Sequence, residues 1–159
     1  MAQPPQNPPA TKARGRPQSV LFACTFNAVR SPMAEAIARH YFGRSIHFAS
    51  AGLKRAEPNG FAAAVMAEIG MDISPHNPRT FEELEDENYD LIVTLSPEAH
   101  HRALEFARDL AAEVVYWPTP DPTAATGSRE MILDAYRETR DRLAARIKSY
   151  LHRPWERQG

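Results

Sequence analysis

Short apolar runs alternate along the chain with longer segments in which apolar side chains recur every three or four residues. The apolar runs predict strands over residues 20–23, 46–49, 90–95 and 113–117. The periodic segments predict helices over residues 32–42, 60–69, 97–110 and 128–151. An acidic segment, 80–87, predicts one further short helix exposed to solvent. Since helices separate the strands, we expect right-handed crossovers and a parallel sheet with helices on both sides, which is an α/β fold.

The residue types at the start of the first helix mark its boundary. Ser31 is predicted to be the N-cap, and Pro32 suits the first helical position because no N–H group is needed there. Met33, Ile37 and Tyr41 recur on one face of this helix. Gly43 is expected to end this helix.

Residues 1–18 differ from the rest of the chain, because they hold five of its fourteen prolines and lack apolar periodicity. We expect this basic, proline-rich segment to be a disordered tail. Residues 19–152 are predicted to form one domain, large enough to bury a substantial core, and residues 153–159 a C-terminal tail.

Composition and charge narrow the classes of function. Outside residues 1–18 the chain carries 16 basic and 20 acidic residues, a net charge of −4, which is not the basic footprint of a nucleic-acid-binding protein. Cys24 is the only cysteine, so no internal disulfide can form. We see no signal-peptide pattern and no long apolar run. These features predict a protein of the reducing cytoplasm with no nucleic-acid or membrane partner.

Cys24 stands at the end of the first predicted strand, and Arg30 stands just before the first predicted helix. A strand that leads through a loop into a helix N-terminus gathers backbone N–H groups, which favour an oxyanion and the thiolate form of a nearby cysteine. Arg30 can bind two oxygens of a phosphate at once. A cysteine at a strand end is usually only a small buried apolar residue. The combined spacing of Cys24, Arg30 and the helix start favours a catalytic cysteine.

Several segments of the chain resemble one known family. The stretch Val20–Cys24, continued by Arg30–Ala36, resembles the signature of the low-molecular-weight protein tyrosine phosphatases and of the arsenate reductases that share their fold. Further matching segments follow in the family's order, at Ser50–Gly52, Ile73–His76, Asp90–Thr94 and Asp121–Pro122. The resemblance implies a three-layer sandwich, in which helices flank a four-stranded parallel sheet.

The resemblance also implies roles for individual residues. Cys24 would be the nucleophile and Arg30 the phosphate clamp. Ser31 would donate a hydrogen bond to the cysteine sulfur, and Asp121 would be the general acid. The phosphate-binding loop between Cys24 and Arg30 would consist of Thr25, Phe26, Asn27, Ala28 and Val29.

Asn27 is expected to hold this loop in an unusual backbone shape through contacts with Ser50 and His76. Asparagine tolerates a left-handed conformation and carries both hydrogen-bond donors and acceptors, so this supporting role is physically reasonable. The resemblance implies no metal and no cofactor. The adjacent His100 and His101 do not suggest a metal site either, because neighbouring side chains on a helix point in different directions.

The chain departs from the family pattern in three places. Phe26 replaces a common glycine, and we expect its ring at the mouth of the pocket. Val29 replaces a second cysteine, which removes a disulfide partner for Cys24. After Asp121–Pro122 the chain reads Thr-Ala-Ala-Thr over residues 123–126, where eukaryotic-type phosphatases have tyrosines that flank a phosphotyrosine ring.

The function predicted from these residues is metal-independent hydrolysis of phosphotyrosine or an aryl phosphate through a cysteinyl-phosphate. The expected partners are a phosphorylated protein or a small aryl phosphate, with inorganic phosphate or another oxyanion as ligand. One alternative is an arsenate reductase that uses an external small thiol such as mycothiol or glutathione. Another is a non-catalytic regulatory module that binds anions.

Overall fold

The computed structural model of this chain describes residues 15–85 and 88–152. Residues 1–14 of the predicted N-terminal tail and all of the predicted C-terminal tail, 153–159, lie outside the described residues. The same holds for residues 86 and 87 at the end of the acidic segment. The domain boundaries therefore stay a prediction.

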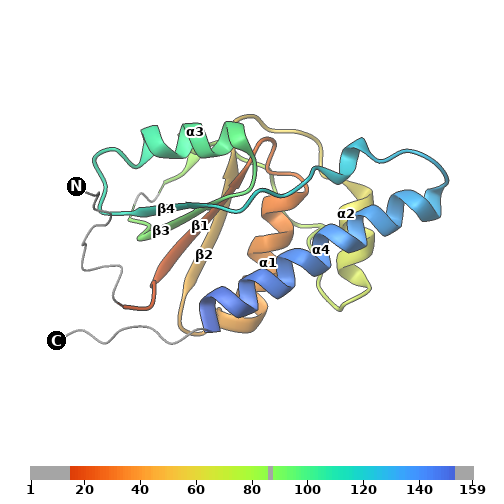
Figure 1. Cartoon of the computed structure of the whole chain (residues 1–159), viewed down its shortest axis with the longest axis horizontal. Coiled ribbons are helices and arrows are strands. Elements are labelled where there is room, and N and C mark those ends of the chain that lie inside the picture. The colour runs from red at the N-terminus through yellow and green to blue at the C-terminus, as the bar shows by residue number, and fades with distance from the viewer. Residues whose placement is uncertain (1–14, 86–87, 153–159) are drawn as a thin grey trace, which may run out of the picture.

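Four parallel strands form the sheet, in the order β2-β1-β3-β4 (Figure 1). Their bounds are β1 Ser19–Cys24, β2 His47–Gly52, β3 Leu91–Thr94 and β4 Glu113–Tyr116. In the register, Cys24 lies opposite Gly52 on β2, and Ala23 lies opposite Thr94 on β3. The carboxyl ends of the central strands therefore meet at one edge, which is where ligands bind in open α/β sheets.

Helices cover both faces of the sheet (Figure 1). Their bounds are α1 Arg30–Phe42, α2 Gly60–Ala67, α3 Pro97–Phe106 and α4 Arg129–His152. Val20 and Phe22 of β1 belong to the core shared with α1, α2 and α4, whereas Leu21 and Ala23 belong to the core shared with α3. This alternation follows from the pleat of a strand, and it explains why β1 reads as a continuous apolar run. The α/β class and the four-stranded parallel sheet flanked by helices are confirmed.

The structure differs from the sequence-based expectations around α1. Helix α1 begins at Arg30, its N-cap is Val29, and no side chain caps it. The prediction of Ser31 as N-cap is therefore wrong, because the Ser31 hydroxyl contacts Cys24 and Asn27 instead. Of the three apolar side chains that recur on one face of this helix, Met33 and Ile37 are fully buried, whereas Tyr41 near the helix end is 48% exposed.

The middle of the chain differs in two further ways. Strand β2 runs to Gly52, three residues beyond the predicted end at residue 49. Over its described residues, 80–85, the acidic segment forms a single 3-10 turn, η2 Phe81–Glu83. Thr80 and Glu83 cap this turn reciprocally, and Phe81 is its only buried residue. One buried side chain gives too little apolar contact to hold a longer helix.

Candidate active site

Cys24 is the last residue of β1, and the loop of residues 25–29 connects it to α1. Its side chain is only 2% exposed. The Cys24 Sγ lies 2.9 Å from the Ser31 Oγ and accepts a longer hydrogen bond, 3.4 Å, from the Ser31 backbone N–H. The structure therefore places the hydroxyl of Ser31 where it can donate to a thiolate on Cys24.

Asn27 organises the interior of the loop. Its φ of 56° lies in the left-handed region, which fits the unusual backbone shape that the family resemblance implies for this loop. Its Nδ2 donates to the hydroxyls of Ser31 and Ser50, at 2.9 Å each, and its Oδ1 accepts from the backbone N–H of Arg79, also at 2.9 Å. The His76 Nε2 lies 3.1 Å from Asn27 Oδ1 and 3.2 Å from its carbonyl oxygen. Both of those atoms are acceptors, so the Nε2 carries the proton and donates.

Gly52 allows the end of β2 to approach the loop closely. A Cβ atom added at this position would lie 2.8 Å from the Asn27 nitrogen and 2.9 Å from both the Phe26 carbonyl carbon and the Thr25 oxygen. The Thr25 carbonyl accepts hydrogen bonds from the backbone N–H groups of Leu53 and residue 54, at 2.8 and 3.1 Å. Any side chain at Gly52 would push the loop away from the sheet. The glycine of the Ser-Ala-Gly segment is therefore needed so that β2 can pack closely against the loop.

Glu35 is a buried carboxylate that the sequence analysis missed. It accepts a 2.6 Å hydrogen bond from Ser50 Oγ and pairs with Arg39. Ser31, Glu35 and Arg39 follow one another at intervals of four, so they lie on one face of α1. That spacing of polar side chains in an otherwise apolar segment is the signal that could have revealed Glu35.

Asp121 sits in the loop after β4 and begins the 3-10 turn η3 Pro122–Ala124. Its Oδ1 accepts from the backbone N–H and the hydroxyl of Thr123, at 3.0 and 2.8 Å. Its Oδ2 lies 3.8 Å from Arg30 Nη2, while Arg30 Nη1 donates to the carbonyl of Thr119 at 2.9 Å. Residues 117–123, which we call the acid loop, therefore hold the Arg30 guanidinium beside the Asp121 carboxylate.

A pocket of about 100 Å³ brings several of the predicted residues together. Cys24, Phe26, Arg30 and Asp121 line it, as do Ala28, Val29, Ala56, Glu57, Asn59 and Thr123. The ring of Phe26 is 43% exposed, in keeping with its expected place at the mouth. Thr25, Asn27 and Ser31 do not line the pocket, and Thr25 instead donates to Ser96 Oγ at 3.0 Å.

Burial lowers the pKa of His76 below its ordinary value of 6.5, because desolvation disfavours the charged imidazolium. The negative charge of Glu35 and the hydrogen bond to Asn27 oppose this effect only in part. A neutral His76 therefore supports the loop near pH 7, as a hydrogen-bond donor rather than a charge.

The described chain contains neither a cluster of metal-binding side chains nor a membrane-spanning helix. Over residues 15–85 and 88–152, no group of three or more His, Cys, Asp or Glu side chains is arranged to hold a metal ion. None of the helices in that same part of the chain combines the length and apolarity needed to cross a membrane.

Comparison with known proteins decides the family. The model of the low molecular weight phosphotyrosine protein phosphatases matches residues 19–157. The chain belongs to this family. The resemblance first seen in separate segments of the sequence is thereby confirmed over residues 19–157.

Curated relatives of this phosphatase-family chain are named arsenate reductases. The arsenate reductase of Halalkalibacterium halodurans is 34% identical over 131 residues, which are 82% of this chain and 93% of the relative. The arsenate reductase of Bacillus subtilis is 31% identical over the same shares of the two chains.

Solved structures similar to this family member include both kinds of enzyme. A low molecular weight protein tyrosine phosphatase from T. tengcongensis has a TM-score of 0.71 and 25% identity, covering 85% of this chain and 98% of the other. An arsenate reductase in a phosphate-binding state has a TM-score of 0.66 and 25% identity, covering 85% and 97%. This chain is therefore an enzyme of a family whose members are phosphatases or arsenate reductases.

Proposed function

We propose that this enzyme is a metal-independent phosphatase that hydrolyses phosphotyrosine in a protein, or an aryl phosphate, through a cysteinyl-phosphate on Cys24. The observation that carries the proposal is the shared pocket of Cys24, Arg30 and Asp121. It holds a nucleophile, a cation for oxyanion oxygens and a carboxyl group that can transfer a proton. Phosphoryl transfer needs those groups in one place.

The first step transfers the phosphoryl group to the enzyme. The Cys24 thiolate attacks phosphorus in line with the ester oxygen, so the S–P bond forms as the P–O bond breaks. Protonated Asp121 donates its proton to the departing oxygen, which leaves as the phenol. Arg30 and the N–H groups of the loop stabilise the equatorial oxygens.

The second step returns the enzyme to its starting state. The Asp121 carboxylate accepts a proton from a water molecule, whose oxygen attacks phosphorus. The S–P bond breaks, and its electron pair stays on Cys24 as the thiolate. The hydroxyl of Ser31, 2.9 Å from Sγ, stabilises that thiolate as it forms. The products are inorganic phosphate and a phenol, with no net oxidation.

Arsenate reduction with an external thiol is a second candidate, and the curated relatives favour it. The Cys24 thiolate would attack arsenic(V) with loss of water. A first external thiol would then attack Sγ, so that the S–As electron pair leaves with arsenic as arsenite. A second thiol would reduce the mixed disulfide on Cys24. Both thiols must be external, because the chain has no other cysteine.

The two candidates separate in one set of assays. Wild type, Cys24→Ser and Asp121→Asn are each given aryl phosphates of differing leaving-group pKa, and separately arsenate with glutathione or mycothiol. We expect phosphatase turnover that Cys24→Ser abolishes and that Asp121→Asn slows by about 10²–10⁴-fold for the most basic leaving groups. Arsenate-dependent thiol oxidation without phosphatase turnover would support the second candidate. Phosphate binding by calorimetry with neither activity would mean a non-catalytic anion-binding module.

A further inference from the structure

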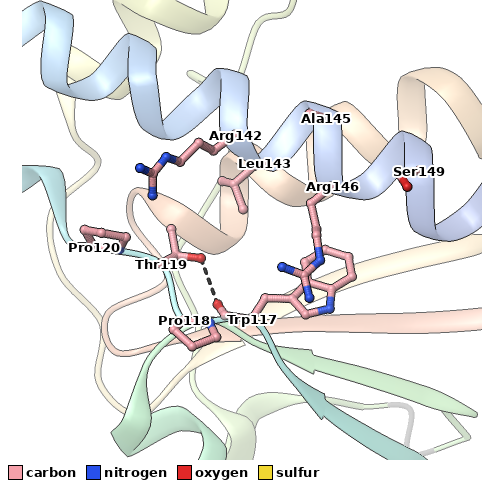
Figure 2. Close-up of a pocket in the computed structure, with 9 residues that line it drawn as sticks. All are labelled: Trp117, Pro118, Thr119, Pro120, Arg142, Leu143, Ala145, Arg146 and Ser149. Atoms are coloured by element: carbon pink, nitrogen blue, oxygen red, sulfur yellow. Dashed lines mark hydrogen bonds between the residues drawn. The ribbon is translucent and has the colours of Figure 1, made fainter.

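A second, larger hollow of about 410 Å³ lies between the acid loop and α4 (Figure 2). Trp117, Pro118 and Pro120 form its loop wall, while Arg142, Arg146 and Ser149 reach it from the helix. These helical residues follow one another at intervals of four and three, so they make one stripe along α4. We call this hollow the α4 groove.

The basic side chains of the α4 groove have few acidic partners. The Arg146 guanidinium lies 4.9 Å over the Trp117 ring, and within the described residues it makes no ion pair. Arg142 approaches Glu138 at 3.5 Å, but both side chains are more than 60% exposed, and such a pair contributes little. Figure 2 shows both guanidinium groups turned toward the loop wall. Their charge is therefore open to an anionic group from outside.

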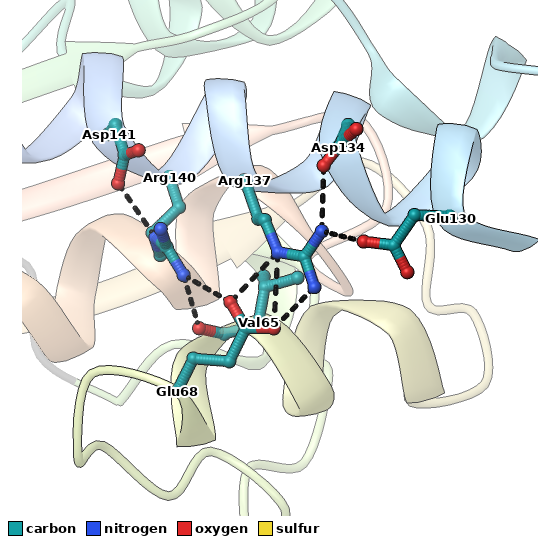
Figure 3. A network of polar contacts seen from close by, with 7 residues as sticks. All are labelled: Val65, Glu68, Glu130, Asp134, Arg137, Arg140 and Asp141. Atoms are coloured by element: carbon teal, nitrogen blue, oxygen red, sulfur yellow. Dashed lines mark hydrogen bonds and ion pairs between the residues drawn. The ribbon is translucent and has the colours of Figure 1, made fainter.

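Two other arginines of α4, Arg137 and Arg140, lie among carboxylates that pair with them (Figure 3). Arg137 binds Glu68, Glu130 and Asp134, each at 2.7 Å. Arg140 pairs with Glu68, the residue that caps the C-terminus of α2, at 2.9 Å and with the neighbouring Asp141 at 2.8 Å. The carboxylate partners already neutralise the charge of these two arginines, which link α4 to the end of α2. The contrast sets Arg142 and Arg146 apart from arginines that only stabilise the fold.

Positive charge continues beyond the α4 groove. Ser149 also lines an adjoining hollow of about 560 Å³, together with Tyr41, Lys148 and His152. The Lys148 ammonium lies 4.8 Å over the exposed Tyr41 ring and makes no ion pair with any residue that the structure describes. Two adjoining hollows thus present cations resting on aromatic rings.

The α4 groove also reaches the active site through the acid loop. Thr119, Pro120 and Arg142 line both this groove and a third hollow, and Asp121 lines that third hollow. Asp121 lines the Cys24 pocket too. A peptide with a phosphorylated residue at Cys24 therefore needs to cross only the short segment around Asp121 to enter the groove.

We propose that the α4 groove binds an acidic segment adjacent to the phosphorylated residue of a protein substrate. This inference rests on the proposed function, because it assumes a phosphorylated protein as substrate. Guanidinium groups bind carboxylates through paired hydrogen bonds, and the proline and tryptophan surfaces offer apolar contact to the peptide between its acidic side chains. The charge is local, since the whole chain has a formal net charge of −1.

The test compares substrates on charge-reversal variants of the full chain. Arg146→Glu is measured against Arg108→Glu, an equal charge change at an exposed residue just beyond α3, on the other side of the sheet. The substrates are an acidic phosphotyrosine peptide, a neutral one of equal length, and an aryl phosphate that is too short to reach the groove.

For each protein we take the ratio of kcat/KM for the acidic peptide to kcat/KM for the aryl phosphate. We expect Arg146→Glu to lower this ratio about tenfold from its wild-type value. The kcat/KM for the neutral peptide should fall much less. Arg108→Glu should keep the wild-type preference for the acidic over the neutral peptide, and Arg146→Lys should keep most of that preference. Equal losses on both peptides, or an undiminished preference in Arg146→Glu, would overturn the proposal.

Binding measurements keep this proposal separate from the proposed function. Fluorescence anisotropy of the labelled acidic peptide on the Cys24→Ser protein needs no turnover. Suppose that the wild type hydrolyses none of the substrates, yet the acidic peptide binds in a salt-dependent way that Arg146→Glu weakens. This result would support acidic-peptide binding in the α4 groove and contradict the proposed phosphatase activity. A single-stranded polynucleotide could instead bind more tightly than the acidic peptide and lose this binding in Arg146→Glu. That result would contradict an acidic peptide segment as the occupant of the α4 groove.

Discussion

Asn27 holds a backbone conformation that costs most residues about 1–2 kcal/mol, and the loop keeps it through side-chain hydrogen bonds. Its amide donates to Ser31 and Ser50 and accepts from the N–H of Arg79. Since Ser31 in turn contacts Cys24 Sγ, the amide fixes the position of the group beside the proposed nucleophile. The effect of this one residue therefore reaches both stability and chemistry.

Replacing Asn27 with alanine should lower the free energy of unfolding by about 1–3 kcal/mol, because buried donors and acceptors lose their partners. It should also lower kcat, since Ser31 loses a contact that orients its hydroxyl. Urea denaturation and aryl phosphate kinetics measure the two effects. Asn27→Gly serves as the control, because it relieves the backbone strain but restores no hydrogen bond. Full recovery in Asn27→Gly would mean that the side-chain contacts contribute nothing.

His76 makes stability depend on pH. Its folded-state pKa lies below the ordinary 6.5, because burial disfavours the charged form. The unfolded chain therefore binds this proton more readily than the folded chain does. The contribution of neutral His76 to stability is complete above pH 6.5 and is lost as the pH falls from there toward the lower folded-state pKa.

His76→Gln should consequently flatten the loss of stability between about pH 7 and pH 5. Glutamine keeps a side-chain N–H donor for Asn27 but does not titrate. Urea denaturation of the two proteins across this range isolates His76, because the remaining histidines are common to both. Parallel pH profiles would show that His76 titrates alike in the folded and unfolded chains.

At this residue scale, family resemblance predicted the contacts of Asn27, whereas local propensity failed at Ser31. A serine before a proline suits an N-cap, but its hydroxyl is engaged by Cys24 and Asn27. Glu35 was missed because a single acidic residue on a helix is usually exposed. Here Ser50 and Arg39 satisfy its carboxylate in the interior.

At the scale of elements, apolar patterns located every strand of the sheet but misjudged where β2 ends. Ser50 and Gly52 carry no apolar side chain, yet they pair with Phe22 and Cys24 of β1. Backbone pairing and the close approach at Gly52 extend the strand, and neither leaves a hydrophobic pattern in the sequence. That extension is what brings β2 against the phosphate-binding loop.

The contact between α2 and α4 depends on Glu68, whose pKa the arginines Arg137 and Arg140 hold at about 2. Because this value lies below that of the unfolded chain, the contribution of Glu68 is present above about pH 4.5 and is lost as the pH falls toward 2. Glu68→Gln should lower Tm at neutral pH and low salt.

The difference in Tm between Glu68→Gln and wild type should shrink at high salt, since the paired groups are partly exposed and therefore screened. It should also shrink at acidic pH, where Glu68 of the wild type becomes protonated. Thermal unfolding at several salt concentrations checks this expectation. A Tm difference that is independent of salt would point to packing rather than charge.

At the scale of the whole molecule, strand order and register explain why distant segments converge. Cys24, Gly52 and Thr94 stand at the carboxyl ends of three adjacent strands, and the acid loop follows the fourth strand. Alternating strands and helices were enough to predict a parallel sheet with its ligand site at the carboxyl ends of the strands, but not the strand order or register. The orientation of Arg30 toward Thr119 was not predictable, because it depends on a loop whose path no pattern encodes.

The most direct test of the account is to look for phosphate on Cys24 during turnover. The full chain is mixed with an aryl phosphate, quenched rapidly in acid, digested, and analysed by mass spectrometry. We predict one added phosphoryl group on the peptide that contains Cys24, and none on that peptide in Cys24→Ala. Steady hydrolysis with no phosphoryl group on that peptide, or undiminished hydrolysis in Cys24→Ser, would contradict the account.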